Sequence, residues 1–155
     1  MSKALKIGVR RGHGDPEFIW NVIVLDLAHN EAVKFLTPEQ YSHEVQQVQC
    51  LACEKDPTHS VTQTVESVED FYELKDKGGP LGRINVRIFF DLDKPIQAIV
   101  ILGAIFKGNN GAMPVGDKKR MKRRKRKYFA GDFGTIDFAK VKAANSEDMR
   151  GGSEG

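Results

Sequence analysis

Cationic side chains lie within and beside apolar segments in the second half of this 155-residue chain. Arg83 and Arg87 fall in the run RINVRIFFDL, and Lys107 ends the run IQAIVILGAIFK. Lys75 and Lys77 come just before a glycine-rich turn. Guanidinium and ammonium groups gathered on one sheet face suit phosphate, and arginine can bind two oxygens at once. We therefore expect these five residues to form a cationic site for RNA backbone phosphates.

Side chains alternate between the two faces of a strand, which divides the first of these runs into two sets. We expect one set to face the core and the other to carry the two arginines, about 13 Å apart along the strand at roughly 3.3 Å per residue. Such a pair can line a groove. Alternatively, the arginines only keep a solvent-facing sheet soluble. The expected core set is Ile84, Val86, Ile88 and Phe90, and the opposite set is Arg83, Asn85, Arg87 and Phe89.

A second cationic feature is the tract KKRMKRRKRK, which holds nine basic residues in ten positions. The net charge of the chain is +3, so the other residues hold 15 Lys and Arg against 21 Asp and Glu. A basic tract on an acidic body points to a polyanion partner rather than to a solvated helix. A ribosomal RNA clamp, a nuclear-type targeting peptide and a generic nucleic-acid tail are all open, and we favour the first. The tract comprises Lys118, Lys119, Arg120, Lys122, Arg123, Arg124, Lys125, Arg126 and Lys127.

Several elements must position these residues. FIWNVIVLDL predicts a strand, and the turn HNE followed by AVKFL suggests a hairpin with a second, shorter strand. TPEQ predicts a capping box that opens a helix over 38–55, with Tyr41, Val45, Val48 and Ala52 on its apolar face. Residues 58–70 predict a loop with a possible local strand.

The segments FYELK, RINVRIFFDL and IQAIVILGAIF predict three strands of an antiparallel meander. A basic helix should follow over 117–128. We expect a flexible N-terminal arm over 1–16, one α+β domain over 17–130, and a partly disordered tail over 131–155. Antiparallel pairing of the meander strands would bring the strand cations and the basic helix into one domain.

Other features exclude some classes of function. No apolar run reaches the roughly 20 residues that span a bilayer, and the N-terminus lacks a signal-peptide pattern, which predicts a cytoplasmic protein without a membrane partner. Cys50 and Cys53 could form a redox dithiol, but we assign them to packing on a helix face. The four histidines show no metal-ligand spacing, so we expect neither a metal site nor a cofactor.

The order YELK, glycine turn, NVRIFF, turn, AIVILGAIFK, Pro114 and basic helix resembles the RelE/ParE superfamily of toxins, especially its phage-derived HigB-like branch. The resemblance covers about residues 71–128. It implies a compact α+β fold with helices packed on one face of an antiparallel sheet. It also implies metal-independent cleavage of mRNA on the ribosome, neutralised by a cognate antitoxin. Because the body is acidic and the cations are local, we expect the antitoxin to cover the face of Arg83, Arg87 and Lys107 with acidic or apolar segments.

The resemblance also implies roles for individual residues. Arg87 matches the strand arginine at the scissile phosphate, Lys75 the basic residue of E-L-[RK], and Lys107 the first lysine of Phe-x-Lys-Lys. The substrate 2′-hydroxyl would attack, with Lys75 or Lys107 as base and a lysine or Tyr128 as acid. Gly108 replaces the second lysine of that element, which favours a non-catalytic nucleic-acid-binding relative as the alternative. A ParE-like gyrase inhibitor is a third possibility.

Overall fold

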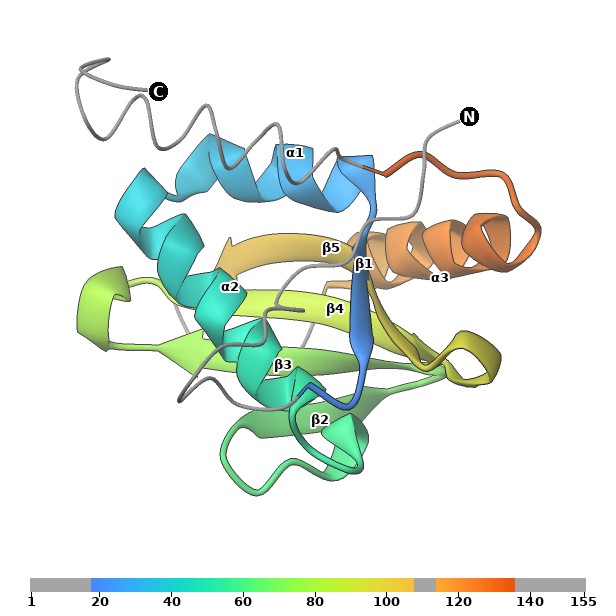
Figure 1. The fold of residues 1–155 in the computed structure, drawn as a ribbon. Helices are drawn as coiled ribbons and strands as arrows, with labels where there is room; N and C mark the ends of the chain where they lie inside the picture. Colours follow the sequence, from blue (N-terminus) through green and yellow to red (C-terminus); the bar gives the residue numbers. More distant parts are fainter. Residues whose placement is uncertain (1–17, 108–113, 136–155) are drawn as a thin grey trace, which may run out of the picture.

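The computed structural model describes residues 18–107 and 114–135 as a five-stranded sheet with three α-helices, which confirms the α+β class (Figure 1). None of the described helices is long and apolar enough to cross a membrane. The predicted N-terminal arm and most of the predicted tail lie outside the described residues. The elements are β1 (Asn21–Val24), α1 (Asp26–Phe35), α2 (Pro38–Ala52), β2 (Thr64–Val68), β3 (Phe71–Lys77), β4 (Asn85–Asp93), β5 (Ala98–Lys107) and α3 (Val115–Phe129), with 3₁₀ turns at Pro57–His59, Gly79–Leu81 and Lys94–Ile96.

The strand order is β1-β5-β4-β3-β2. Neighbouring strands from β2 to β5 are antiparallel, which confirms the predicted meander, and β2 falls within the segment expected to be mostly loop. The first strand pairs in parallel with β5, with Asn21 opposite Ala98. The sheet is therefore mixed rather than wholly antiparallel.

The predicted N-terminal hairpin is wrong, because α1 occupies the segment that was expected to hold a turn and a second strand. Ala28 and Ala32, four residues apart, are buried on one side of this helix. The neighbouring Glu31 accepts a hydrogen bond of 3.1 Å from the backbone N–H of Ala104 in β5. Since β1 pairs with β5 only as far as Ile101, α1 lies along the part of β5 that β1 leaves uncovered.

The capping box of α2 is confirmed. Thr37 Oγ1 accepts from the backbone N–H of Gln40 at 3.1 Å, and Gln40 Oε1 accepts from the backbone N–H of Thr37 at 3.0 Å. The predicted apolar face is also confirmed, since Val48 is buried and Tyr41 and Val45 pack against the core. Gln40 Nε2 donates to the carbonyl of Pro80, so the start of α2 is held against the β3–β4 connection.

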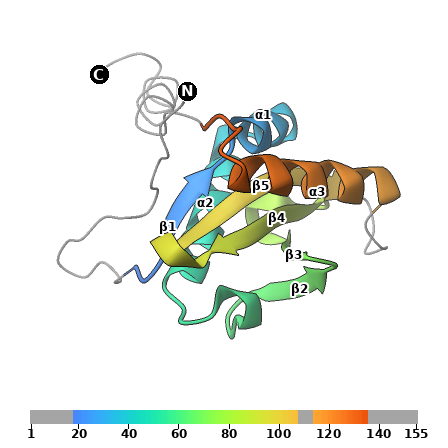
Figure 2. The same ribbon diagram turned by 90° about the vertical axis from the view of Figure 1, so that its right-hand side faces the viewer.

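Helices cover both faces of the sheet, with α2 in front of it and α3 behind it in Figure 1 (see also Figure 2). Val86 and Ile88 of β4 share a cavity with α2. On the other face, Gly103 lies opposite Phe89, and a Cβ atom on Gly103 would collide with Met121 of α3. The expectation that all helices pack on one face is therefore wrong, and this sheet has two apolar faces to bury.

The basic helix begins at Val115, two residues before the predicted start, with Pro114 at the N-cap position and Asp117 in the first turn. The chain then returns to the domain. Phe133 packs on Tyr128 with ring centroids 4.6 Å apart, and Thr135 forms a bridge to Leu25 at the end of β1. The first residues of the predicted tail thus belong to the folded unit.

Candidate functional site

The third helix has a buried side that holds it to the sheet. Met121, Arg124 and Tyr128 recur at helical spacing and are all buried. Arg124 donates from Nη1 to the carbonyl of Leu102 at 2.9 Å. Its Nη1 and Nη2 each donate to a different oxygen of Glu31, both at 2.8 Å. One arginine of the basic tract is therefore part of the core contact between α1, β5 and α3.

Acidic residues neutralise the flanks of the same helix. Arg120 pairs with Asp117 at 2.6 Å and with Glu31 at 3.1 Å. Lys125 lies 2.9 Å from the Asp91 carboxylate in β4, and Lys122 pairs with Glu69 in the β2–β3 turn. With Arg124, these pairs occupy four of the nine basic residues of the tract. Their main effect is to attach α3 to the sheet.

The other five cations of α3 are directed toward solvent. Lys119, Arg123, Arg126 and Lys127 are exposed and Lys118 is partly exposed. None of the five forms an ion pair with the parts of the chain that the structure describes. Positions 119, 123, 126 and 127 follow the i, i+4, i+7, i+8 spacing of one helix face. We call these five residues the α3 cation face: Lys118, Lys119, Arg123, Arg126 and Lys127.

Arg87 does not face a groove. Only 1% of its surface is exposed, and its Nη1 donates to Glu73 Oε2 of β3 at 3.2 Å. Glu73 is itself buried, and Arg87 Nη2 has no hydrogen-bond partner among the described residues. The predicted exposure of this guanidinium is wrong because the sheet face that carries it is covered as well. This burial does not support the expected role of Arg87 at a scissile phosphate.

The remaining predicted strand cations lie near one end of the sheet. Lys77, Asn85 and Lys107 stand side by side across β3, β4 and β5, and Lys75 stands opposite Arg87. Lys75 is paired with Glu66 of β2 at 2.8 Å, and Lys77 is exposed. The structure therefore brings Lys75, Lys77 and Lys107 to one end of the sheet.

Two further predicted site residues lie apart from this row. Arg83 is exposed but precedes β4, so it does not share the strand with Arg87. Tyr128 is buried, and its hydroxyl donates to Asp93 Oδ2 at 2.7 Å. Burial, this hydrogen bond and the Asp93 charge raise the pKa of the phenol above its ordinary value. Tyr128 is thus suited to holding α3 against the β4–β5 turn rather than to releasing a proton to RNA.

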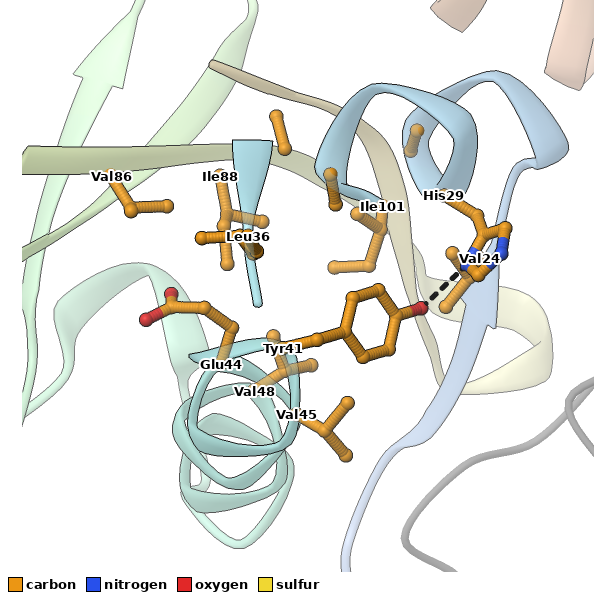
Figure 3. A pocket seen from close by; sticks show the side chains of 13 residues that line it. Val24, His29, Leu36, Tyr41, Glu44, Val45, Val48, Val86, Ile88 and Ile101 are labelled. Atoms are coloured by element: carbon orange, nitrogen blue, oxygen red, sulfur yellow. Dashed lines mark hydrogen bonds between the residues drawn. The ribbon is translucent and has the colours of Figure 1, made fainter. Parts of the chain in front are cut away.

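An apolar cavity of about 50 Å³ lies between α1, α2 and the sheet (Figure 3). Tyr41 reaches across it to His29 of α1, and its hydroxyl shares a hydrogen bond of 2.7 Å with His29 Nδ1. Burial lowers the pKa of His29 and raises that of Tyr41 to about 12. Both groups are therefore held neutral at physiological pH, and a cavity of this volume is too small for a large ligand.

Glu44 is the acidic residue among those that line this cavity, and its side chain projects from α2 toward Val86 (Figure 3). Burial raises its pKa to about 9, and the neighbouring Asp76 adds to the effect. Asp76 also lies 3.0 Å from His43, one of the four histidines in which the sequence shows no metal-ligand spacing. No local pattern in the sequence marks this group, because His43 and Glu44 stand on a helix and Asp76 on a strand after it.

The two cysteines differ from their expected role in packing. Cys50 is exposed on α2, and Cys53 is partly exposed at the C-terminal cap of the same helix. The apolar face of α2 is formed instead by Val48, Leu51 and Ala52. The cysteines therefore contribute little to the core.

Comparison with protein-family models finds no match, and comparisons with curated proteins and with solved structures find none either.

Proposed function

We propose that this protein binds the phosphate backbone of nucleic acid through the α3 cation face, with RNA as the first ligand to test. The observation that carries the proposal is the division of α3 into two sides. Four of its basic residues are paired with acids that fix the helix to the domain, and five are left toward solvent. Like charges so close together repel one another unless an anion lies against them.

The spacing of this face suits an extended polyanion. From position 119 to position 127 the helix rises about 12 Å at 1.5 Å per residue, with four cations on one side. Phosphates along a nucleic-acid strand can be contacted in series by such a row, and the contacts are independent of base sequence. Lys77 is exposed at the end of the sheet where β5 finishes, before the chain continues to α3. It adds positive charge on the sheet face that α3 covers.

The proposal concerns binding and requires no cleavage. Arg87, the residue expected at the scissile phosphate, is buried and paired with Glu73. The burial of Arg87 favours the non-catalytic alternative over the ribosome-dependent ribonuclease. A cognate antitoxin and a gyrase-directed activity remain predictions that rest on the resemblance alone.

The binding experiment compares two triple variants with the same loss of charge. One replaces Arg123, Arg126 and Lys127 with Gln, and the other replaces the exposed Lys34, Lys55 and Lys94 with Gln. Fluorescence anisotropy with a labelled single-stranded RNA is measured over a salt series. At about 0.7 per phosphate contact, the first variant should flatten the slope of log affinity against log salt by about 2 units, and the second should change it little.

If both variants lost RNA affinity equally, binding would depend only on net charge and not on the α3 cation face. If the unaltered protein did not bind RNA, the proposal would be rejected. A separate assay tests cleavage. Primer extension on a reporter mRNA after induction in cells should show no translation-dependent cuts. If cuts are seen, Lys75→Gln and Lys107→Gln are the informative variants, because replacing Arg87 would also disturb the fold.

A further inference from the structure

Three side chains of metal-ligand type converge where α2 lies against β3. His43 Nε2 is 3.0 Å from Asp76 Oδ2 and 3.8 Å from Glu44 Oε2. One ligand atom from each residue lies within 4.8 Å of the other two. A helix and a strand that are distant in sequence therefore place one imidazole nitrogen and two carboxylate oxygens around a common point.

Glu44 provides a second and independent observation. The residue is 4% exposed, and neither of its carboxyl oxygens has a hydrogen-bond partner of good geometry among the described residues. Buried polar groups almost always have partners, and a buried polar group without one is costly. Within the described part of the chain, His43 is the only ion-pair partner of Glu44 and the only one of Asp76. Glu44 thus presents unused ligand atoms to the point where the three side chains meet.

We propose that His43, Glu44 and Asp76 bind a divalent transition-metal ion, with Zn²⁺ the preferred metal. Zinc bonds of about 2.0–2.2 Å in a tetrahedral site place neighbouring ligand atoms about 3.3 Å apart. The 3.0 and 3.8 Å separations lie on either side of that value and the third separation is within 4.8 Å, so rotations of the side chains can bring the three ligand atoms into this geometry.

The ligand set distinguishes between metals. An imidazole nitrogen suits Zn²⁺ and its transition-metal neighbours, whereas Ca²⁺ takes six to eight oxygen ligands and Mg²⁺ prefers octahedral oxygen coordination. Three protein ligands leave a fourth position for water, as in zinc sites that are open to solvent. The side chains of His43 and Asp76 are 21% and 14% exposed, so the ion enters from their side. The bound metal joins α2 to β3.

The test uses the full chain after chelator treatment. Zn²⁺ and Co²⁺ are titrated by calorimetry, and the visible spectrum of the Co²⁺ form reports tetrahedral coordination. One equivalent should bind, and zinc should raise the midpoint of thermal unfolding because it binds the folded state. His43→Ala, Glu44→Gln and Asp76→Asn should each weaken binding by more than about tenfold. Circular dichroism without metal establishes that each variant is folded.

His59→Ala is the matched control, because His59 pairs with Asp56 at 2.9 Å on the surface and no third ligand joins them among the described residues. It should bind zinc as the unaltered protein does. The site is rejected if the unaltered protein binds neither metal, or if folded Glu44→Gln binds and is stabilised equally. Tighter binding of Mg²⁺ or Ca²⁺ than of Zn²⁺ would overturn the metal class. Since Glu44→Gln keeps the size of the buried side chain, it decides the question even if another variant unfolds.

Discussion

Glu31 and Arg124 form a two-pronged ion pair that joins α1 to α3 past the edge of β5. Each guanidinium terminal nitrogen donates to a separate carboxylate oxygen at 2.8 Å. Burial alone would raise the pKa of Glu31, but hydrogen bonds from Arg124 and the Ala104 backbone, with the charges of Arg124 and Arg120, hold the pKa below its ordinary value. One carboxylate therefore connects two helices and a strand.

Replacing Glu31 with Gln should destabilise the protein by about 2–3 kcal/mol, because it leaves Arg124 buried without its anion. The free energy of unfolding is measured by urea denaturation near neutral pH. Glu39→Gln, at an exposed position in the first turn of α2, is the control and should change stability little. A Glu31→Gln protein as stable as the control would show that the ion pair orients the two helices without stabilising the fold.

Arg87→Ala should lower the free energy of unfolding by about 3–5 kcal/mol, because Glu73 would remain as an uncompensated buried carboxylate. The double variant Arg87→Met with Glu73→Leu should recover much of this loss, since it removes both charges and keeps apolar volume. Arg83→Ala, which changes an exposed arginine nearby, should be nearly neutral. Urea denaturation of the four proteins tests this. Similar stability of the Arg83 and Arg87 single variants would contradict the buried pair.

Gly103→Ala should destabilise the contact between β5 and α3 by about 1–3 kcal/mol. A Cβ atom there would collide with the Met121 thioether and lie 2.8 Å from Arg124 Nη1, and Met121 is fully buried. Gly116→Ala is the matched control, because its added Cβ meets open space in the first turn of α3. That change should be neutral or slightly stabilising. Thermal unfolding that ranks the two variants in the reverse order would contradict the packing of α3 on this face.

His29 should make the protein less stable as pH falls. Its folded pKa lies below the ordinary value of 6.5 because of burial, so the unfolded chain takes up the proton first. The stabilisation by neutral His29 is complete above that value and is lost as pH falls through the window between the unfolded and folded pKa. Urea denaturation over about pH 5 to 8, where histidine titrates, measures the slope of the free energy of unfolding against pH for the unaltered protein and for His29→Gln. A slope equal in both would contradict the buried neutral imidazole.

Elements with local signals were predictable from the sequence. The capping box of α2 involves residues three apart, and the meander strands have continuous apolar patterns between glycine or proline turns. The first helix lacked such a signal. Its N-cap is Leu25, which makes no side-chain cap, and its β-branched and aromatic residues favour a strand locally. Packing against β5 determines the helix instead.

The candidate sites show the same limit. Nine basic residues in ten predicted a cationic helix, but only contacts from Glu31, Glu69 and Asp91 determine which of them remain available to a ligand. The burial of Arg87 could not be read from strand alternation, because alternation does not tell whether a second layer covers the other face. The group of His43, Glu44 and Asp76 likewise depends on how α2 crosses β3.

The parallel pairing of β1 with β5 has a consequence for the order of events during synthesis. Within the described chain, β1 has no other strand partner. Asn21 therefore cannot form its sheet pairing until Ala98, 77 residues later in the chain, has been synthesised. A nascent chain that stops before β5 therefore holds its first strand without a sheet to join, and α1 lacks the edge on which it packs. Pairings between such distant segments slow folding, since loop entropy is lost before the contacts form. This protein should fold after release of its last strand, as one cooperative step rather than progressively from its N-terminus.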